Sequence, residues 1–182
     1  MLFQLRLLAY RFAKMFLKPV VKLVPQPRPV LFVGPDSASQ LCRMMAAFRF
    51  ERVLIVTDAM LVTLGLVDPI RKALEIGGIA VSVFDASQPD PTYEVIARGH
   101  QAARAHRSDA VLAVGGGSSI DAAKVIAAMA TTDKPPQKLV GFFKLTKPML
   151  PLFVIPTTAG TGSEVTVAAI VSDPETHAKA AV

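Results

Sequence analysis

Short apolar runs of strand length, separated by helical patterns, constrain the fold of this chain more than any other feature. The runs predict four strands, at Arg52–Thr57, Ile79–Phe84, Ala110–Val114 and Leu152–Ile155. The continuous apolar character of 52–57 and 110–114 is typical of strands buried on both faces. Helices are predicted between the strands, at Leu66–Ile76, Tyr93–His106 and Ser119–Ala130. Right-handed crossovers then give an α/β, Rossmann-like, mainly parallel sheet with helices on both faces.

Residues 29–182 are predicted to form this single domain. With 182 residues, 52% of them hydrophobic, the chain can bury one substantial core. The domain is expected to open with a short strand at Val30–Val33 and a helix at Ser37–Phe48, capped by Asp36 or Ser37. The one cysteine, Cys42, excludes a disulfide framework and a cysteine zinc site, and a cytoplasmic location is expected.

Residues 1–28 are predicted to be a basic amphipathic helix with a Pro-rich linker. Charges recur through its apolar part, which argues against a membrane span and against a signal peptide. Docking on the protein or on a second subunit is favoured over weak attachment to an anionic membrane surface. The net charge of +6 comes from this segment, because six basic residues precede the first acidic residue, Asp36. No basic face with interleaved aromatics follows, so no nucleic-acid partner is expected.

A glycine loop, Gly115-Gly116-Gly117-Ser118, follows the third predicted strand and opens a helix. Ligands of parallel sheets bind beyond the carboxyl ends of the strands, and the backbone of such a loop can approach a diphosphate closely. The loop is neither a P-loop nor a Gly-x-Gly-x-x-Gly motif, because Ile120 stands where the last glycine would be. Its alternative interpretation is a tight turn with Ser118 as the helix cap. Asp121 and Lys124 are expected to stabilise the helix as a pair.

Two further features lie at predicted strand ends. Asp58 can accept hydrogen bonds from an adenosine ribose and would repel a 2′-phosphate, which favours NAD over NADP, although a helix cap is the simpler role. The segment 156–166, rich in glycine and hydroxyl side chains, can close over a ligand and bond to it from several directions.

Together these motifs resemble the iron-containing (group III) alcohol dehydrogenase family. The resemblance rests on Gly115-Gly116-Gly117-Ser118-x-x-Asp121-x-x-Lys124 and on Pro156-Thr157-Thr158-Ala159-Gly160-Thr161-Gly162-Ser163-Glu164-Val165-Thr166, and it covers about residues 30–182. It implies a cofactor-binding α/β domain followed by a helical domain that holds a divalent metal, usually iron.

The resemblance also implies the cofactor contacts. Asp58 would hold the adenosine ribose, and Gly116, Gly117 and Ser118 would cradle the diphosphate. Thr157, Thr158 and Thr166 would line the cofactor toward the nicotinamide, and Lys179 would reach a cofactor ribose. Asp90 stands at a contact where the family often has asparagine, and an aspartate can also accept hydrogen bonds there.

The family's metal ligands, one aspartate and three histidines, are expected beyond Val182. Asp173 and His177 have the spacing of the first two ligands but precede Lys179, and Pro174 predicts a turn there, so both are interpreted as loop residues. His100 and His106 are expected on a helix surface. The chain is therefore expected to contain no metal ligand or catalytic acid or base, to lack the helical domain and to be inactive alone.

The function predicted is that of the cofactor part of an NAD- and metal-dependent dehydrogenase for a small alcohol or aldehyde, to which the residues of this chain contribute binding and orientation. Two alternatives stay open: a truncated, non-catalytic NAD-binding fragment, and a relative resembling glycerol dehydrogenase. A homo-oligomer is also expected.

Overall fold

The computed structural model describes residues 29–132, 134–141, 144–145, 147–173 and 179–182. The chain divides into two compact units, Met1–Leu31 and Phe32–Val182, and all helices and strands described below belong to the second. The predicted amphipathic helix and linker at 1–28 lie outside the described residues. No helix in the described part is both long and apolar enough to cross a membrane.

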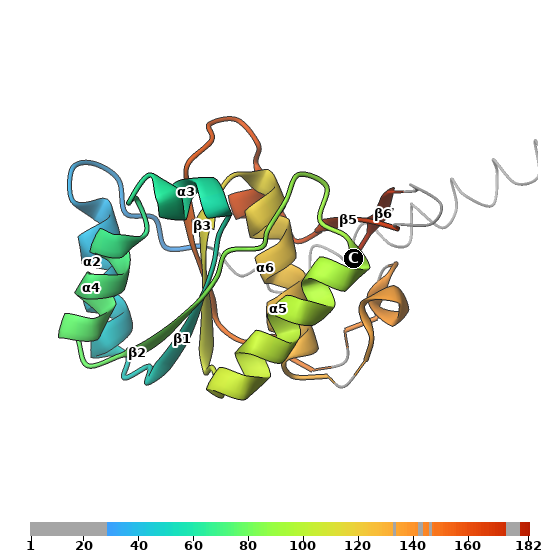
Figure 1. The fold of residues 1–182 in the computed structure, drawn as a ribbon, viewed down its shortest axis with the longest axis horizontal. Coiled ribbons are helices and arrows are strands. Elements are labelled where there is room, and N and C mark those ends of the chain that lie inside the picture. Colours follow the sequence, from blue (N-terminus) through green and yellow to red (C-terminus); the bar gives the residue numbers. More distant parts are fainter. Residues whose placement is uncertain (1–28, 133, 142–143, 146, 174–178) are drawn as a thin grey trace, which may run out of the picture. The chain divides into compact units, whose positions relative to one another are not determined.

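The four predicted strands form one wholly parallel sheet (Figure 1). They are β1 (Arg52–Val56), β2 (Ala80–Phe84), β3 (Ala110–Gly115) and β4 (Leu152–Pro156), in the order β2-β1-β3-β4. In β1 the side chains of Val53–Val56 are fully buried, and all six residues of β3 are buried. The predicted mainly parallel α/β sheet is confirmed, and so is the full burial of its two central strands.

Helices cover both faces of this sheet, as predicted. On one face, α2 (Ser37–Ala47) and α4 (Asp68–Ile76) pack against Val53 and Ile55; on the other, α5 (Tyr93–His106) and α6 (Gly117–Met129) pack against Leu54 and Val56. Successive side chains of a strand point to opposite faces, so an unbroken apolar run supplies both cores. Each fully buried aliphatic side chain contributes about 1.5–3 kcal/mol.

The prediction of a strand at Val30–Val33 is wrong. Residues 29–33 carry no strand, and Val33 is 88% exposed. Among the described residues the sheet ends at β2 and β4, and residues 29–33 pair with neither edge. β-branched residues alone do not make a strand, since a strand needs a hydrogen-bonding neighbour.

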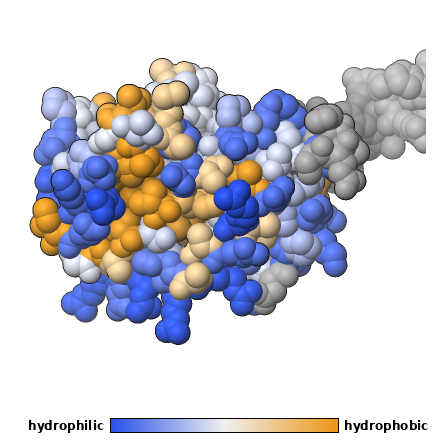
Figure 2. All heavy atoms as spheres, in the orientation of Figure 1, coloured by the Kyte–Doolittle hydropathy of each residue, from blue (hydrophilic) through white to orange (hydrophobic). Residues whose placement is uncertain are grey.

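Several short elements were not predicted. They are the helix α3 (Ala59–Thr63), the 3-10 turns η1 (Pro136–Leu139) and η2 (Ser163–Val165), and the antiparallel pair β5 (Ile170–Ser172) and β6 (Lys179–Ala181). Hydrophobic side chains gather on the surface over α3 (Figure 2), where Met60 is 68% exposed and Leu64 is 62% exposed.

Candidate functional site

The glycine loop and the threonine-rich loop lie against each other, because β3 and β4 are adjacent and parallel. The backbone N–H of Thr157 donates to the carbonyl of Gly115 at 3.0 Å. A Cβ added to Gly116 would lie 2.9 Å from Thr158 Oγ1, and one added to Gly117 would lie 3.2 Å from Ser163 Oγ. The two loops thus lie in contact at the carboxyl edge of the sheet, and glycine is what lets them approach this closely.

The helix α6 begins inside the glycine loop, two residues earlier than predicted. Gly116 is its N-cap in an extended conformation, and no side chain caps it. Ser118 therefore lies in the first turn, and the alternative in which it caps the helix is wrong. The first amides of a helix have no partner within it and point along the positive end of its dipole. The amides of Gly117, Ser118 and Ser119 are in this position, which is the geometry of an anion site.

Gly115 makes the sharp turn from β3 into α6. Its φ of 156° is a conformation that residues with a side chain seldom adopt, and a Cβ there would lie 2.7 Å from both Cβ and Oγ of Ser119. Ser119 is buried and belongs to α6, so it has little room to move away. The turn that presents the helix amides thus requires glycine at 115.

Asp58 lies at the carboxyl end of β1 and caps α3. Its Oδ1 accepts a hydrogen bond from Leu61 N at 2.9 Å, so the helix-cap role is present in the structure. The side chain is half-buried, and no contact between described residues uses Oδ2. A Cβ added to Gly115 would lie 3.7 Å from Leu61 Cδ1, which places α3 beside the glycine loop. One carboxylate oxygen of Asp58 caps the helix, and the other has no partner among the described residues.

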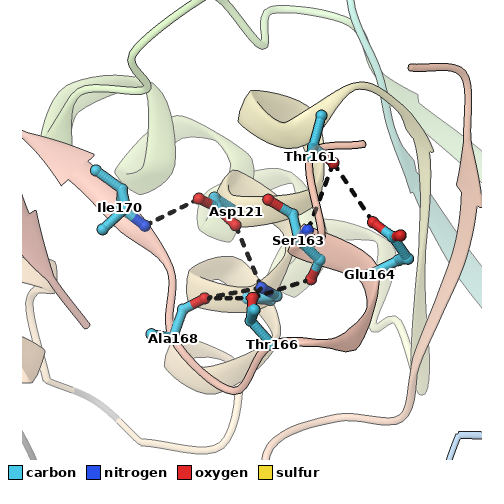
Figure 3. A network of polar contacts seen from close by, with 8 residues as sticks. Asp121, Thr161, Ser163, Glu164, Thr166, Ala168 and Ile170 are labelled. Atoms are coloured by element: carbon cyan, nitrogen blue, oxygen red, sulfur yellow. Dashed lines mark hydrogen bonds and ion pairs between the residues drawn. The ribbon is translucent and has the colours of Figure 1, made fainter. Parts of the chain in front are cut away.

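Thr166 is tied to α6 through a buried charged pair (Figure 3). Lys124 Nζ donates to Thr166 Oγ1 at 3.0 Å and to the carbonyl of Ala168 at 2.8 Å, and it pairs with Asp121 Oδ1 at 3.2 Å. Asp121 Oδ2 accepts from Ile170 N at 3.0 Å. Asp121 and Lys124 do more than the predicted stabilisation of their own helix, because they also fasten the segment 166–170 to it.

Asp90 and Lys179, predicted separately as cofactor contacts, form an ion pair with Nζ and Oδ1 2.6 Å apart. Both side chains are more than half exposed. Asp90 has a positive φ of 55°, a left-handed conformation that aspartate and asparagine tolerate better than most residues. The structure thus brings together two residues 89 positions apart, and their pairing had no signal in the sequence.

Thr157 and Thr158 lie exposed in the loop after β4, next to the glycine loop. Of the nine predicted cofactor-binding residues, seven gather at the strand ends and their two loops, or are fastened to α6. Asp90 and Lys179 pair with each other near the start of α5, where Ser172 N donates to the carbonyl of Pro91 at 2.9 Å. The sequence did not predict that Lys124 anchors another segment. Its spacing from Asp121 was visible, but its other two partners, Thr166 and Ala168, lie more than 40 residues away.

Within the described residues, no three His, Cys, Asp or Glu side chains are grouped so that they could hold a metal ion. Asp173 lies in the loop after β5, and His177 lies outside the described residues. On α5, His106 Nε2 lies 3.2 Å from the carbonyl of Ala80. Cys42 of α2 is buried in the core, and loss of solvent raises the pKa of its thiol.

Comparison with known proteins identifies the family of this site. The family model described as iron-containing alcohol dehydrogenase matches residues 27–182. The chain belongs to this family. Alcohol dehydrogenase 4 of Schizosaccharomyces pombe is 36% identical to it over 149 residues, which make up 82% of this chain and 35% of that protein. The NAD-dependent methanol dehydrogenase of Bacillus methanolicus is 33% identical over 145 residues, 80% of this chain and 38% of that protein.

Solved structures of iron-containing alcohol dehydrogenases and their relatives share the fold. Alcohol dehydrogenase from Oenococcus oeni matches with a TM-score of 0.79 and 31% identity over 83% of this chain and 40% of that chain. Sulfoacetaldehyde reductase from Bifidobacterium kashiwanohense, solved in complex with NAD+, matches with a TM-score of 0.78 and 29% identity over 87% of this chain and 42% of that chain. The chain thus spans well under half the length of the relatives that it matches.

Proposed function

We propose that this chain is the cofactor-binding part of a metal-dependent dehydrogenase that transfers a hydride between a small alcohol or aldehyde and NAD. The observation that carries the proposal is the contact between the glycine loop and the threonine-rich loop around the uncapped N-terminus of α6. A diphosphate fits this edge, because helix amides point into it and Gly116 and Gly117 leave the backbone accessible.

The residues of the chain bind and orient the cofactor in this proposal. The amides of Gly117 and Ser118 hold the diphosphate, and Asp58 Oδ2 accepts from the adenosine ribose. Thr157, Thr158 and Thr166 line the remainder of the cofactor, and Lys179 reaches a ribose while Asp90 holds its ammonium. The bound nicotinamide supplies the hydride chemistry, and these residues fix its place.

The test of this proposal is the nucleotide affinity of the 182-residue chain, measured by calorimetry. We expect NAD to bind more tightly than NADP, because the Asp58 carboxylate repels a 2′-phosphate. Asp58→Asn keeps the helix cap, since asparagine caps as well as aspartate, but it removes the charge. We expect this variant to melt like the wild type and to lose most of its preference for NAD.

Asp58→Ala serves as the control, because it removes the cap as well and should cost about 0.5–2 kcal/mol of stability. Equal affinities of the wild type for NAD and NADP would refute the assignment of Asp58. No binding of either nucleotide would refute the proposed function.

The metal requirement, iron by family, is proposed for the intact enzyme. None of the described residues forms a metal-binding group, so we assign no metal contact to them. The rival proposal is a chain that binds NAD without catalysing a reaction. Metal analysis and an alcohol oxidation assay separate the two: stoichiometric iron or zinc with activity in the 182-residue chain would eliminate the rival.

The location and partners of the protein are also proposals. We propose a cytoplasmic homo-oligomer, with the exposed apolar side chains over α3 as one candidate surface for association. Sedimentation with anionic and neutral vesicles tests the alternative of a weak membrane-surface contact through residues 1–24. Absence of binding to either vesicle would exclude a membrane contact.

A further inference from the structure

The side chain of Lys124 is a buried cation whose hydrogen bonds are all directed at one segment and one carboxylate. Its side chain and that of Asp121 are each only 11% exposed. A buried charge is costly unless it is paired and hydrogen-bonded, so the protein maintains this arrangement against a considerable desolvation penalty. The pair is polar and adds little to the hydrophobic core, but it holds the segment 166–170 against α6.

The hydrogen bonds of Lys124 determine what Thr166 can do. An ammonium has three donors and no acceptor, and the structure uses them on Asp121, Thr166 and Ala168. Thr166 Oγ1 therefore accepts from Lys124, and its own hydrogen must be donated elsewhere. The acceptors available among the described residues are the carbonyls of Ser163 and Ala168, both at 3.4 Å. Since O–H···O bonds are usually 2.5–3.0 Å long, neither holds this hydrogen well.

Thr166 is exposed, and its hydroxyl oxygen already accepts a hydrogen bond from Lys124. The hydrogen of the same hydroxyl has no acceptor at a good distance among the described residues. Asp121 strengthens the arrangement, because its second oxygen receives the amide of Ile170 and so fixes the chain just after Thr166. Figure 3 shows Asp121 on the helix, with Thr166, Ala168 and Ile170 of the following segment lying next to it. The hydroxyl is held in place before any ligand arrives.

We propose that Lys124 is a positioning residue that makes Thr166 a hydrogen-bond donor to an acceptor oxygen of the bound dinucleotide. This inference rests on the proposed function, since it concerns the same site. Lys124 itself does not touch the ligand, because its three donors are already used. A purely structural Lys124 would instead stabilise the fold without a specific link to Thr166.

A double-mutant cycle in the 182-residue chain distinguishes these roles, with NAD affinity measured by calorimetry. The variants are Lys124→Met, Thr166→Val and both together. Methionine has a side chain of similar length without the charge, and Lys124 lines an apolar cavity of about 450 Å³ together with Val125 and Val154. We expect each single variant to bind NAD about 3- to 10-fold more weakly, the range for a lost hydrogen bond. The double variant should bind within about twofold of Thr166→Val alone, because both changes remove the same donor.

Additive losses, or a Thr166→Val variant that binds NAD like the wild type, would overturn the proposal. The second outcome does so even if Lys124→Met fails to fold, since Thr166 is exposed and its replacement leaves the buried pair intact. Thr166→Ser keeps a hydroxyl and should restore most of the affinity. Met129→Ala, a buried site on the same helix, is the matched control, and it should lower the melting temperature without changing NAD affinity. A wild-type chain that binds no NAD would contradict the proposed function itself, whereas NAD binding with additive losses would contradict only this inference.

Discussion

Replacement of Gly115 by alanine should lower the stability of the fold. Replacement of Gly117 by alanine should weaken NAD binding and leave the stability nearly unchanged. The two glycines are two residues apart, but their surroundings differ. A Cβ at 115 would lie 2.7 Å from the Cβ and Oγ of Ser119, a buried residue of the same turn. The nearest atoms to a Cβ at 117 are Ser163 Oγ at 3.2 Å and Thr161 Cβ at 3.4 Å, on a loop that can give way.

The cost at Gly115 has two parts. Carbon atoms in good contact lie about 3.5–4.0 Å apart, so the new methyl would overlap Ser119 strongly, and such overpacking costs about 1–3 kcal/mol. The φ of 156° adds backbone strain of about 1–3 kcal/mol for a residue with a side chain. A total of about 2–6 kcal/mol corresponds to a lower melting temperature by at least about 4 °C in a chain of this size.

Thermal unfolding followed by circular dichroism, together with NAD calorimetry, measures both effects. Gly117→Ala should change stability by less than about 1 kcal/mol, because alanine at a helix start relieves some entropy cost. Its methyl would stand where we propose that the diphosphate approaches, so NAD affinity should fall by at least about tenfold. If Gly115→Ala melts within about 1 °C of the wild type, or if Gly117→Ala is the less stable of the two, the steric reasoning is wrong.

Two further predictions concern stability away from the site. Asp109 accepts from the amides of Glu51 at 2.7 Å and Arg52 at 3.0 Å, so Asp109→Ala should lower the free energy of unfolding by about 1–3 kcal/mol in urea titrations; an unchanged midpoint would refute this role. Burial raises the pKa of the Cys42 thiol above its ordinary value of 9.0, so its contribution to stability is complete well below pH 9 and is lost as the pH rises through and above that value. Between pH 8 and about 10, the free energy of unfolding of Cys42→Ala should therefore fall less than that of the wild type. Equal slopes of this free energy against pH for the two proteins would contradict the raised pKa.

Much of the fold could be predicted because its central strands carry their signal locally. An unbroken apolar run such as Val53–Val56 is stable only where both faces are covered, so its sequence already implies helices on both sides. The run at Val30–Val33 shows the limit of this reasoning, since the same residue types form no strand without a neighbour. Elements of three residues, such as β5 and β6, are too short for any periodicity to register.

The candidate site was predictable to the extent that strand order determines it. Loops that follow adjacent parallel strands must meet, so the contact between Gly116 and Thr158 follows from the fold. The ion pair of Asp90 with Lys179 spans 89 positions, and a contact between such distant residues leaves no mark on local sequence. Asp58 has one role of each kind. Its helix cap is a local feature that the sequence can predict, whereas the proposed role of its second oxygen depends on the position of α3 beside the glycine loop.

One helix carries both halves of the proposed cofactor site. The N-terminal amides of α6 belong to the glycine loop, and Lys124, two turns or about 10 Å further along, holds the Thr166 segment. Because α6 is packed tightly against the sheet, with ten of its thirteen residues buried, it moves little relative to either loop. The distance between an anion at the glycine loop and the Thr166 hydroxyl is therefore set by the helix and not by the flexibility of the loops. A ligand long enough to reach both points meets a site that is already spaced for it, which lowers the entropy that binding must cost.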